Sequence, residues 1–162
     1  MVLSGTYELT IDGKNRLSIP ASVRAALDPE TQGTTFYIVP GTPITTLHLY
    51  PDRYFQSYSE QRHASLTPTA EQTQFEQVYY SMVTLLEPDN QGRVVLPKWL
   101  LDNVGIGKQV TVTGARDHLV IWNRAEHAIF MRQNGPRHPD LYQFAVDKTI
   151  EAGRSVFPPT RS

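Results

Sequence analysis

Short runs of β-branched and aromatic residues, separated by turn residues, recur along the chain in two similar groups. The runs are "TTFYIVPG" and "TTLHLYP" in the first group, and "QVTVTG" and "HLVIW" in the second. Such runs predict β-strands. A short helical pattern precedes each pair, "ASVRAAL" at 21–27 and "KWLLDNV" at 98–104. Each group is therefore expected to fold as a strand, a tight turn, a strand, a short helix, two more strands and the start of another helix.

The segment ahead of each short helix is a repeated motif, "DGKNRLSIP" at Asp12–Pro20 and "DNQGRVVLP" at Asp89–Pro97. Aligning the two motifs superposes an aspartate, an arginine and a proline, with apolar residues at the same places between them. Proline suits the first turn of a helix because its missing N–H has no intrahelical partner there. Gly105 and Gly107 then supply a stop for the second helix. A unit of about fifty residues buries too little surface to be stable alone, so the repeats are expected to share one core.

Between the repeats, the chain predicts two helices broken at Thr67-Pro68, since a residue that precedes proline avoids the helical conformation. In the second helix, the apolar residues at helical spacing are Phe75, Val78, Tyr79 and Met82. Most such stripes pack on their own domain, which is the favoured interpretation. The alternative is a subunit interface.

Together these patterns predict an α+β fold, in which two β-rich repeats share one core and have short helices and a helical pair between and after them. The expected divisions are a first repeat at 4–55, an intervening helical segment at 56–82, a second repeat at 83–131 and a partly helical C-terminal tail at 132–162. The tail gives no functional signal.

Composition narrows the possible functions. The 162 residues are 40% hydrophobic, as in a packed globule, and include no cysteine, which excludes disulfides, thiolate metal sites and cysteine nucleophiles. A net charge of -1 argues against coating nucleic acid through bulk charge, so any such binding must be local or summed over several copies. With no apolar run long enough to span a membrane and no signal peptide pattern, we expect no membrane association and a cytoplasmic location.

Two copies of an Asp-x-x-x-Arg turn, each followed by apolar-x-apolar-Pro and a short helix, resemble the MraZ family of bacterial regulators. This family is found with cell-division and cell-wall genes and belongs to the SpoVT–AbrB group. The resemblance covers about residues 4–130, including "LHLYPD" and "LVIWNR". It implies a β-rich, pseudo-twofold unit built from two AbrB-like repeats with a swapped-hairpin, double-psi-like fold. It further implies that subunits assemble into a homo-oligomeric ring. It also implies that motif segments of several subunits bind repeated boxes of double-stranded promoter DNA, hence a nucleoid-associated location.

Two departures from the family pattern are visible. Family members usually have glycine before the motif arginine, and here Gly92 keeps it while Asn15 replaces it. Asparagine is the non-glycine residue that adopts positive φ most readily, so the same turn is expected in both copies. The intervening helix at 68–82 carries no arginine, whereas similar sequences tend to carry several.

The candidate DNA-binding residues are the cations of the two motifs and of the helices that follow them: Lys14, Arg16, Arg24, Arg93 and Lys98. Arginine offers a planar fork of donors that suits phosphate oxygens or the edge of guanine, whereas lysine acts as a point charge. Gln91 takes the place of Lys14 in the second copy. The first copy is therefore the better candidate for base contact.

The residues expected to brace the turns are Asp12, Asn15, Asp89 and Gly92. A carboxylate that opens a turn can accept hydrogen bonds from backbone N–H groups two residues on and can hold the arginine four residues later. One alternative stays open at this point. Arg16 and Arg93 could be used up wholly by pairing with their aspartates.

Other functions fit the sequence less well. Two related aspartates suggest an aspartic-protease dyad, but the motifs lack the Asp-Thr-Gly or Asp-Ser-Gly that such enzymes carry. The five histidines have no metal-ligand spacing and are expected to be single surface or edge residues, and no phosphate loop or nucleophile elbow is present. We expect no enzyme activity, cofactor, metal or small-molecule substrate. An antitoxin that binds a toxin through residues 133–162 is the alternative function, although such antitoxins are usually single-copy.

Overall fold

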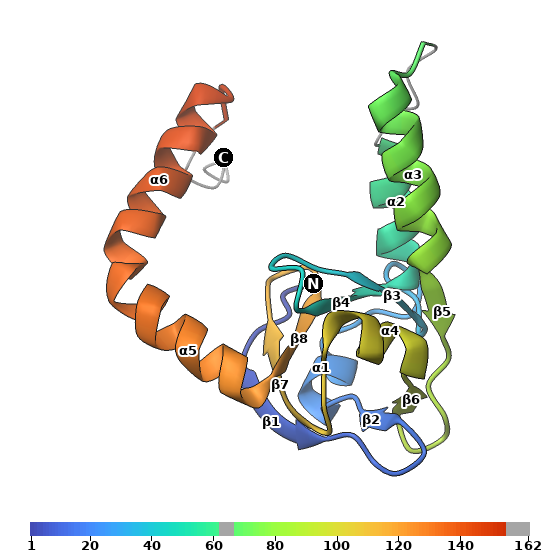
Figure 1. Cartoon of the computed structure of the whole chain (residues 1–162). Helices are drawn as coiled ribbons and strands as arrows, with labels where there is room; N and C mark the ends of the chain where they lie inside the picture. The colour runs from blue at the N-terminus through green and yellow to red at the C-terminus, as the bar shows by residue number, and fades with distance from the viewer. Residues whose placement is uncertain (62–66, 155–162) are drawn as a thin grey trace. The chain divides into compact units, whose positions relative to one another are not determined.

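The computed structural model describes residues 1–61 and 67–154. Residues 1–124 form one compact unit and residues 125–162 belong to a second. The strands are β1 (Thr6–Thr10), β2 (Arg16–Ser18), β3 (Phe36–Pro40), β4 (Leu47–Pro51), β5 (Thr84–Leu86), β6 (Arg93–Val95), β7 (Gln109–Gly114) and β8 (Leu119–Asn123). The helices are α1 (Ala21–Ala25), α2 (Asp52–Gln61), α3 (Ala70–Met82), α4 (Lys98–Val104), α5 (Arg124–Asn134), the short 3₁₀ helix η1 (Gly135–Arg137) and α6 (His138–Glu151). Figure 1 shows these helices and strands within each unit.

The main sheet has six strands in the order β1-β7-β8-β4-β3-β5, and each neighbouring pair is antiparallel. The first strand of each repeat pairs with the hairpin of the other repeat, since β1 pairs with β7 and β5 pairs with β3. The two hairpins meet at β4 and β8 in the middle. If each strand is replaced by its equivalent in the other repeat, the same strand order results, read from the opposite edge of the sheet. The α+β fold of two related units with swapped hairpins is therefore confirmed.

A second, two-stranded ribbon holds the repeated motifs. Strands β2 and β6 pair antiparallel, and Leu17 faces Val94 at the centre of their register. These two residues are equivalent in the two repeats, so the pseudo-twofold axis passes between them. Both side chains are fully buried. The ribbon thus fixes one motif relative to the other.

One hydrophobic core serves both repeats, as the small size of each repeat predicts. Its fully buried members include Leu17, Ile38 and Leu49 from the first repeat and Val94, Val110 and Ile121 from the second. Alternate positions of the strands point into this core, which is the period of a half-buried strand. Helix α4 adds Leu100 and Leu101 and ends at Val104. The next residue, Gly105, has a φ of 74° and forms a left-handed cap at the stop predicted from the sequence.

The helical pair between the repeats is confirmed, and α3 begins after the expected break. Thr69 caps α3 by accepting a hydrogen bond from the backbone N–H of Gln72, whose side chain accepts one from the N–H of Thr69. The predicted apolar face is only partly covered. Phe75 is 52% exposed and Val78 is 60% exposed, while Tyr79 and Met82 are half-buried. Packing on its own domain therefore does not account for the outer half of this face.

The second unit is helical in its described part. The pattern "LYQFAVDKTIEAG" falls largely within α6, and neither α5 nor α6 contains a buried residue. Within residues 1–61 and 67–154, no helix combines the length and apolar character needed to cross a membrane.

Candidate nucleic-acid interface

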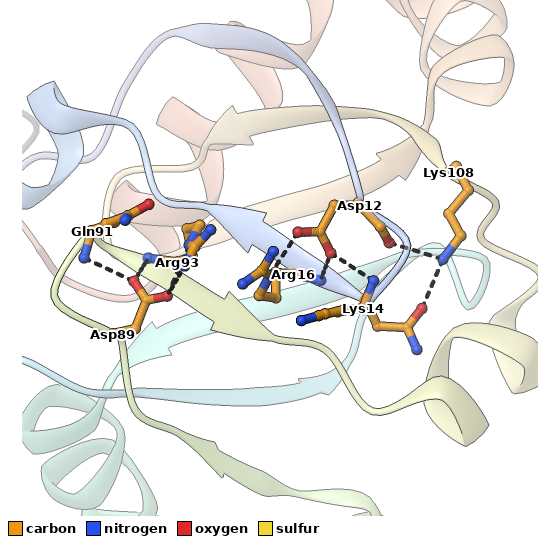
Figure 2. A network of polar contacts seen from close by, with 8 residues as sticks. Asp12, Lys14, Arg16, Asp89, Gln91, Arg93 and Lys108 are labelled. Atoms are coloured by element: carbon orange, nitrogen blue, oxygen red, sulfur yellow. Dashed lines mark hydrogen bonds and ion pairs between the residues drawn. The ribbon is translucent and has the colours of Figure 1, made fainter.

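The first motif turn is closed by the carboxylate of Asp12 (Figure 2). Its Oδ1 accepts hydrogen bonds from the backbone N–H groups of Lys14 and Arg16, both at 2.9 Å. Its Oδ2 accepts from Arg16 Nε at 2.6 Å. These bonds favour the charged form, the backbone N–H of Arg16 most of all, and lower the pKa of Asp12 to about 2. The aspartate therefore holds both the turn and the arginine.

The second turn repeats these three hydrogen bonds. Asp89 Oδ1 accepts from the backbone N–H groups of Gln91 at 2.9 Å and Arg93 at 3.0 Å, and Oδ2 accepts from Arg93 Nε at 2.8 Å. The backbone N–H of Arg93 is the main cause that lowers the pKa of Asp89 to about 2. Because each carboxylate is separately stabilised in its charged form, the pair does not share a proton as a protease dyad would.

The residue before each arginine has the same backbone conformation. Asn15 has a φ of 59° and Gly92 a φ of 75°. In both turns its N–H donates to the aspartate carbonyl, at 3.0 Å in the first and 2.9 Å in the second. Asparagine therefore takes up the left-handed conformation that glycine supplies in the other copy.

Each arginine keeps donors available beyond its aspartate. Arg16 uses Nε on Asp12, and Arg93 uses Nε and Nη2 on Asp89. Within the described part of the chain, the terminal nitrogens of Arg16 make no further hydrogen bond. The side chains are 28% and 26% exposed, respectively. Pairing with the aspartates thus leaves part of each guanidinium open to a ligand.

The antiparallel ribbon regroups the other candidate cations. The backbone N–H of Leu96 donates to Asn15 O at 2.8 Å, so α4 begins beside the first turn. Lys98 and Lys108 line a pocket of about 210 Å³ together with Asn15. Lys98 itself is paired with Asp102 at 2.6 Å. A cation that follows the second motif in sequence therefore lies with the first turn.

Arg24 follows the first motif in sequence but lies beside the second turn. The backbone N–H of Ile19 donates to Gly92 O at 2.9 Å, which brings α1 beside the second turn. Arg24 Nε donates to Ile19 O at 3.2 Å, and a Cβ added to Gly92 would lie 2.7 Å from this nitrogen. Lys14 stays at the first turn, where its exposed ammonium has no partner among the described residues. The sequence places Arg24 with the first motif, whereas the fold places it against the second.

Sequence reasoning did not identify Lys108, whose ammonium donates to Asn15 Oδ1 at 2.8 Å (Figure 2). No motif marks this lysine, because it is a single cation ahead of a strand in the other repeat. The pairing of β1 with β7, which continues as a bond from Ile11 N to Lys108 O at 2.8 Å, is what carries it to the turn. Only a correct prediction that β1 pairs with β7 would have placed Lys108 beside the first turn.

The histidines differ from expectation at one place. The rings of His48 on β4 and His118 next to β8 lie in contact, tilted by 34° with centroids 4.4 Å apart, so they are not single residues. Burial, together with the neighbouring His118, lowers the pKa of His48 to about 4. Asp117 contacts His118 Nδ1 at 2.7 Å. Among the described residues, no group of three or more His, Asp or Glu side chains could hold a metal ion.

Comparison with known proteins adds to this geometry. The family described as "MraZ protein, putative antitoxin-like" matches residues 2–76 and 81–138. The chain belongs to the MraZ family. The resemblance predicted from the two motifs is thereby confirmed.

Relatives named "Transcriptional regulator MraZ" match most of the length of the chain. The relative from Moorella thermoacetica is 30% identical over 146 residues, which is 90% of this chain and 98% of that protein. The relative from Desulfitobacterium hafniense strain DSM 10664 / DCB-2 is 31% identical over 149 residues, 92% of this chain and 97% of that protein. The MraZ relatives are named as regulators and not as enzymes, which confirms the prediction that the chain is not an enzyme.

Proposed function

We propose that the chain is a transcriptional regulator that binds double-stranded DNA through the β2–β6 ribbon and its two turns. The observation that carries the proposal is the pair of equivalent turns, each with an arginine oriented by a charged aspartate and still offering donors. An arginine fixed in this way loses little conformational freedom when it contacts a phosphate or a guanine edge. Family relatives named as transcriptional regulators support this function.

The first turn is the proposed base-reading turn. Lys14 and Arg16 lie on it, and the fold adds Lys98 beside it. The second turn has Arg93 with Arg24 alongside. We propose that this second pair mainly contacts phosphates, which position the protein without reading sequence.

We propose further that subunits assemble into a homo-oligomeric ring that engages repeated promoter boxes. A chain with a net charge of -1 makes few phosphate contacts alone, and linked subunits raise the effective concentration of each contact. Phe75 and Val78 on α3 support self-association, because they leave apolar surface exposed.

Cell-division and cell-wall genes are the proposed targets, and a nucleoid-associated, cytoplasmic location follows from them. The function needs no cofactor, membrane or small-molecule substrate.

The test is a gel shift on the gene's own upstream region with wild type, Arg16→Ala and Arg93→Ala. Arg137→Ala is the matched control, because this exposed arginine lies in η1 outside the ribbon. We expect loss of the sequence-specific band with Arg16→Ala, a weaker but still specific band with Arg93→Ala, and no change with the control. A monomer by light scattering that retains no tandem-repeat DNA at low salt would refute the proposal.

A second candidate is an antitoxin, favoured by the words "antitoxin-like" in the family description. In this case the chain would hold a protein toxin through residues 133–162. Purification from its own cells, with and without these residues, separates the two functions. A small protein retained in equal molar amount by the full chain alone would favour the antitoxin.

A further inference from the structure

Lys108 is hydrogen-bonded to the first turn and the residue before it through both its main chain and its side chain. Its carbonyl accepts a hydrogen bond from Ile11 N at 2.8 Å. Its ammonium donates to Asn15 Oδ1 at 2.8 Å and to Asp12 O at 3.2 Å. Figure 2 shows this side chain reaching the turn from outside the ribbon. The lysine therefore links the second repeat to the segment that carries Lys14 and Arg16.

The shorter of the two bonds from the Lys108 ammonium ends on the side chain of Asn15, which the glycine of the second turn lacks. Asn15 is held through its main chain, because its O accepts from Leu96 N at 2.8 Å. At a φ of 59° it adopts a conformation that L-residues other than Asn and Asp rarely take. A charge-assisted hydrogen bond to its amide oxygen favours this conformation over the extended alternatives. The side chain of Asn15 thus becomes a second point of attachment.

The second turn is held differently. Gly92 has no side chain, and the space where one would start is filled by the guanidinium of Arg24. In the first repeat, Thr35 precedes β3 as Lys108 precedes β7, so no lysine stands at the equivalent position. The bond between a lysine and the turn residue is therefore specific to the first turn.

We propose that Lys108 is a positioning residue for DNA recognition, which fixes the first turn through Asn15 so that Lys14 and Arg16 meet DNA in one orientation. Two of the three N–H donors of its ammonium are already bonded to the turn, which is why we assign it to the turn and not to a phosphate. The neighbouring Lys98 is engaged by Asp102 and does not replace it. This inference rests on the proposed DNA-binding function.

The first experiment compares Lys108→Met with Lys14→Met, the same chemical change at a lysine without a partner in the described part of the chain. Binding to promoter DNA and to a scrambled duplex is measured over a range of salt. Loss of a phosphate contact lowers the slope of log K against log salt by about 0.9 per subunit, which we expect for Lys14→Met. For Lys108→Met we expect promoter affinity about threefold lower per subunit, as for one exposed hydrogen bond, with the slope and the scrambled-duplex affinity unchanged. A slope reduced as in Lys14→Met, or an unchanged promoter affinity, would overturn the proposal.

The second experiment needs no DNA. Amide hydrogen exchange at Lys14, Asn15 and Arg16 should accelerate in Lys108→Met, while exchange at Gly92 stays as in wild type. In the Asn15→Gly background the same substitution should change exchange and DNA affinity much less, because only the longer bond to Asp12 O is left to lose. Equal exchange in all variants would refute the attachment itself. Accelerated exchange in a protein that binds no DNA would instead refute the proposed function and the recognition role with it.

Discussion

The first and second turns have the same internal hydrogen bonds but different neighbours. In both, an aspartate accepts two backbone N–H groups and the Nε–H of the arginine, and Asp89 also pairs with Arg93 Nη2. Around this common centre, the first turn has an asparagine bonded to Lys108, and the second has a glycine covered by Arg24. Local sequence determines how a turn closes, whereas the other repeat determines which cations surround it.

The largest expected effect concerns the proposed subunit assembly, which must be removed before the two turns can be compared in a single subunit. Phe75→Glu with Val78→Glu places two charges on the exposed face of α3 and should convert the assembly to monomers by light scattering. Promoter affinity should fall about a hundredfold or more, because the gain from linked binding is lost. Circular dichroism should match wild type, since neither side chain is buried.

In this monomeric background, Arg16→Ala and Arg93→Ala can be measured per subunit. A stronger effect of Arg16→Ala would sharpen the difference between the turns. An assembly that stays intact would show that α3 is not part of the subunit contact.

The next effect separates the two reasons for glycine at position 92, which are the positive φ and the close approach of Arg24. Gly92→Val should lower the free energy of unfolding by about 2–3 kcal/mol, since valine at positive φ is strained and its Cβ meets Arg24. Gly105→Val has a similar φ of 74° but open space, so it should be less destabilising. Gly13→Val has neither problem and serves as the control.

Denaturant midpoints give the order of these three variants. Arg24→Ala should recover the steric part of the Gly92→Val loss and leave the part due to strain. If Gly92→Val were as stable as Gly13→Val, the covering of the second turn by Arg24 would be of no consequence.

The smallest effect tests what the turns share. Both aspartate pKa values are lowered from an ordinary 3.8 to about 2. The carboxylates therefore contribute stability that is fully present above the ordinary pKa and is lost as the pH falls through about 2. The stability difference between wild type and either Asp12→Asn or Asp89→Asn should shrink over this window. Carboxyl NMR titrations should give two similar midpoints, and a midpoint near 3.8 for one aspartate would break the equivalence.

The features that depend on neighbours in sequence were predictable. The aspartate contacts reach two and four residues along the chain, and the left-handed position of Asn15 follows from its alignment with Gly92. The helix stop at Gly105 is local for the same reason. Short-range bonds of this kind can be predicted because the few residues that form them are adjacent in the sequence.

The features that depend on strand pairing were not predictable. Which cation lies beside which turn follows from the antiparallel register of β2 with β6, and a register between distant segments cannot be read from either segment alone. The contact between the rings of His48 and His118 likewise results from the pairing of β4 with β8. The exposed half of α3 could not be foreseen, because helical spacing marks an apolar face without naming what covers it.

The ribbon centred on Leu17 and Val94 also bears on how such a protein can diverge. In a dimer of identical single-repeat chains, every substitution would appear at both turns at once. Fusion of the two repeats in one chain removes this constraint, so one turn can acquire an asparagine while the other keeps its glycine. Because each turn is completed by the opposite half, such a change must be matched by a residue far away in the same gene, as Asn15 is by Lys108.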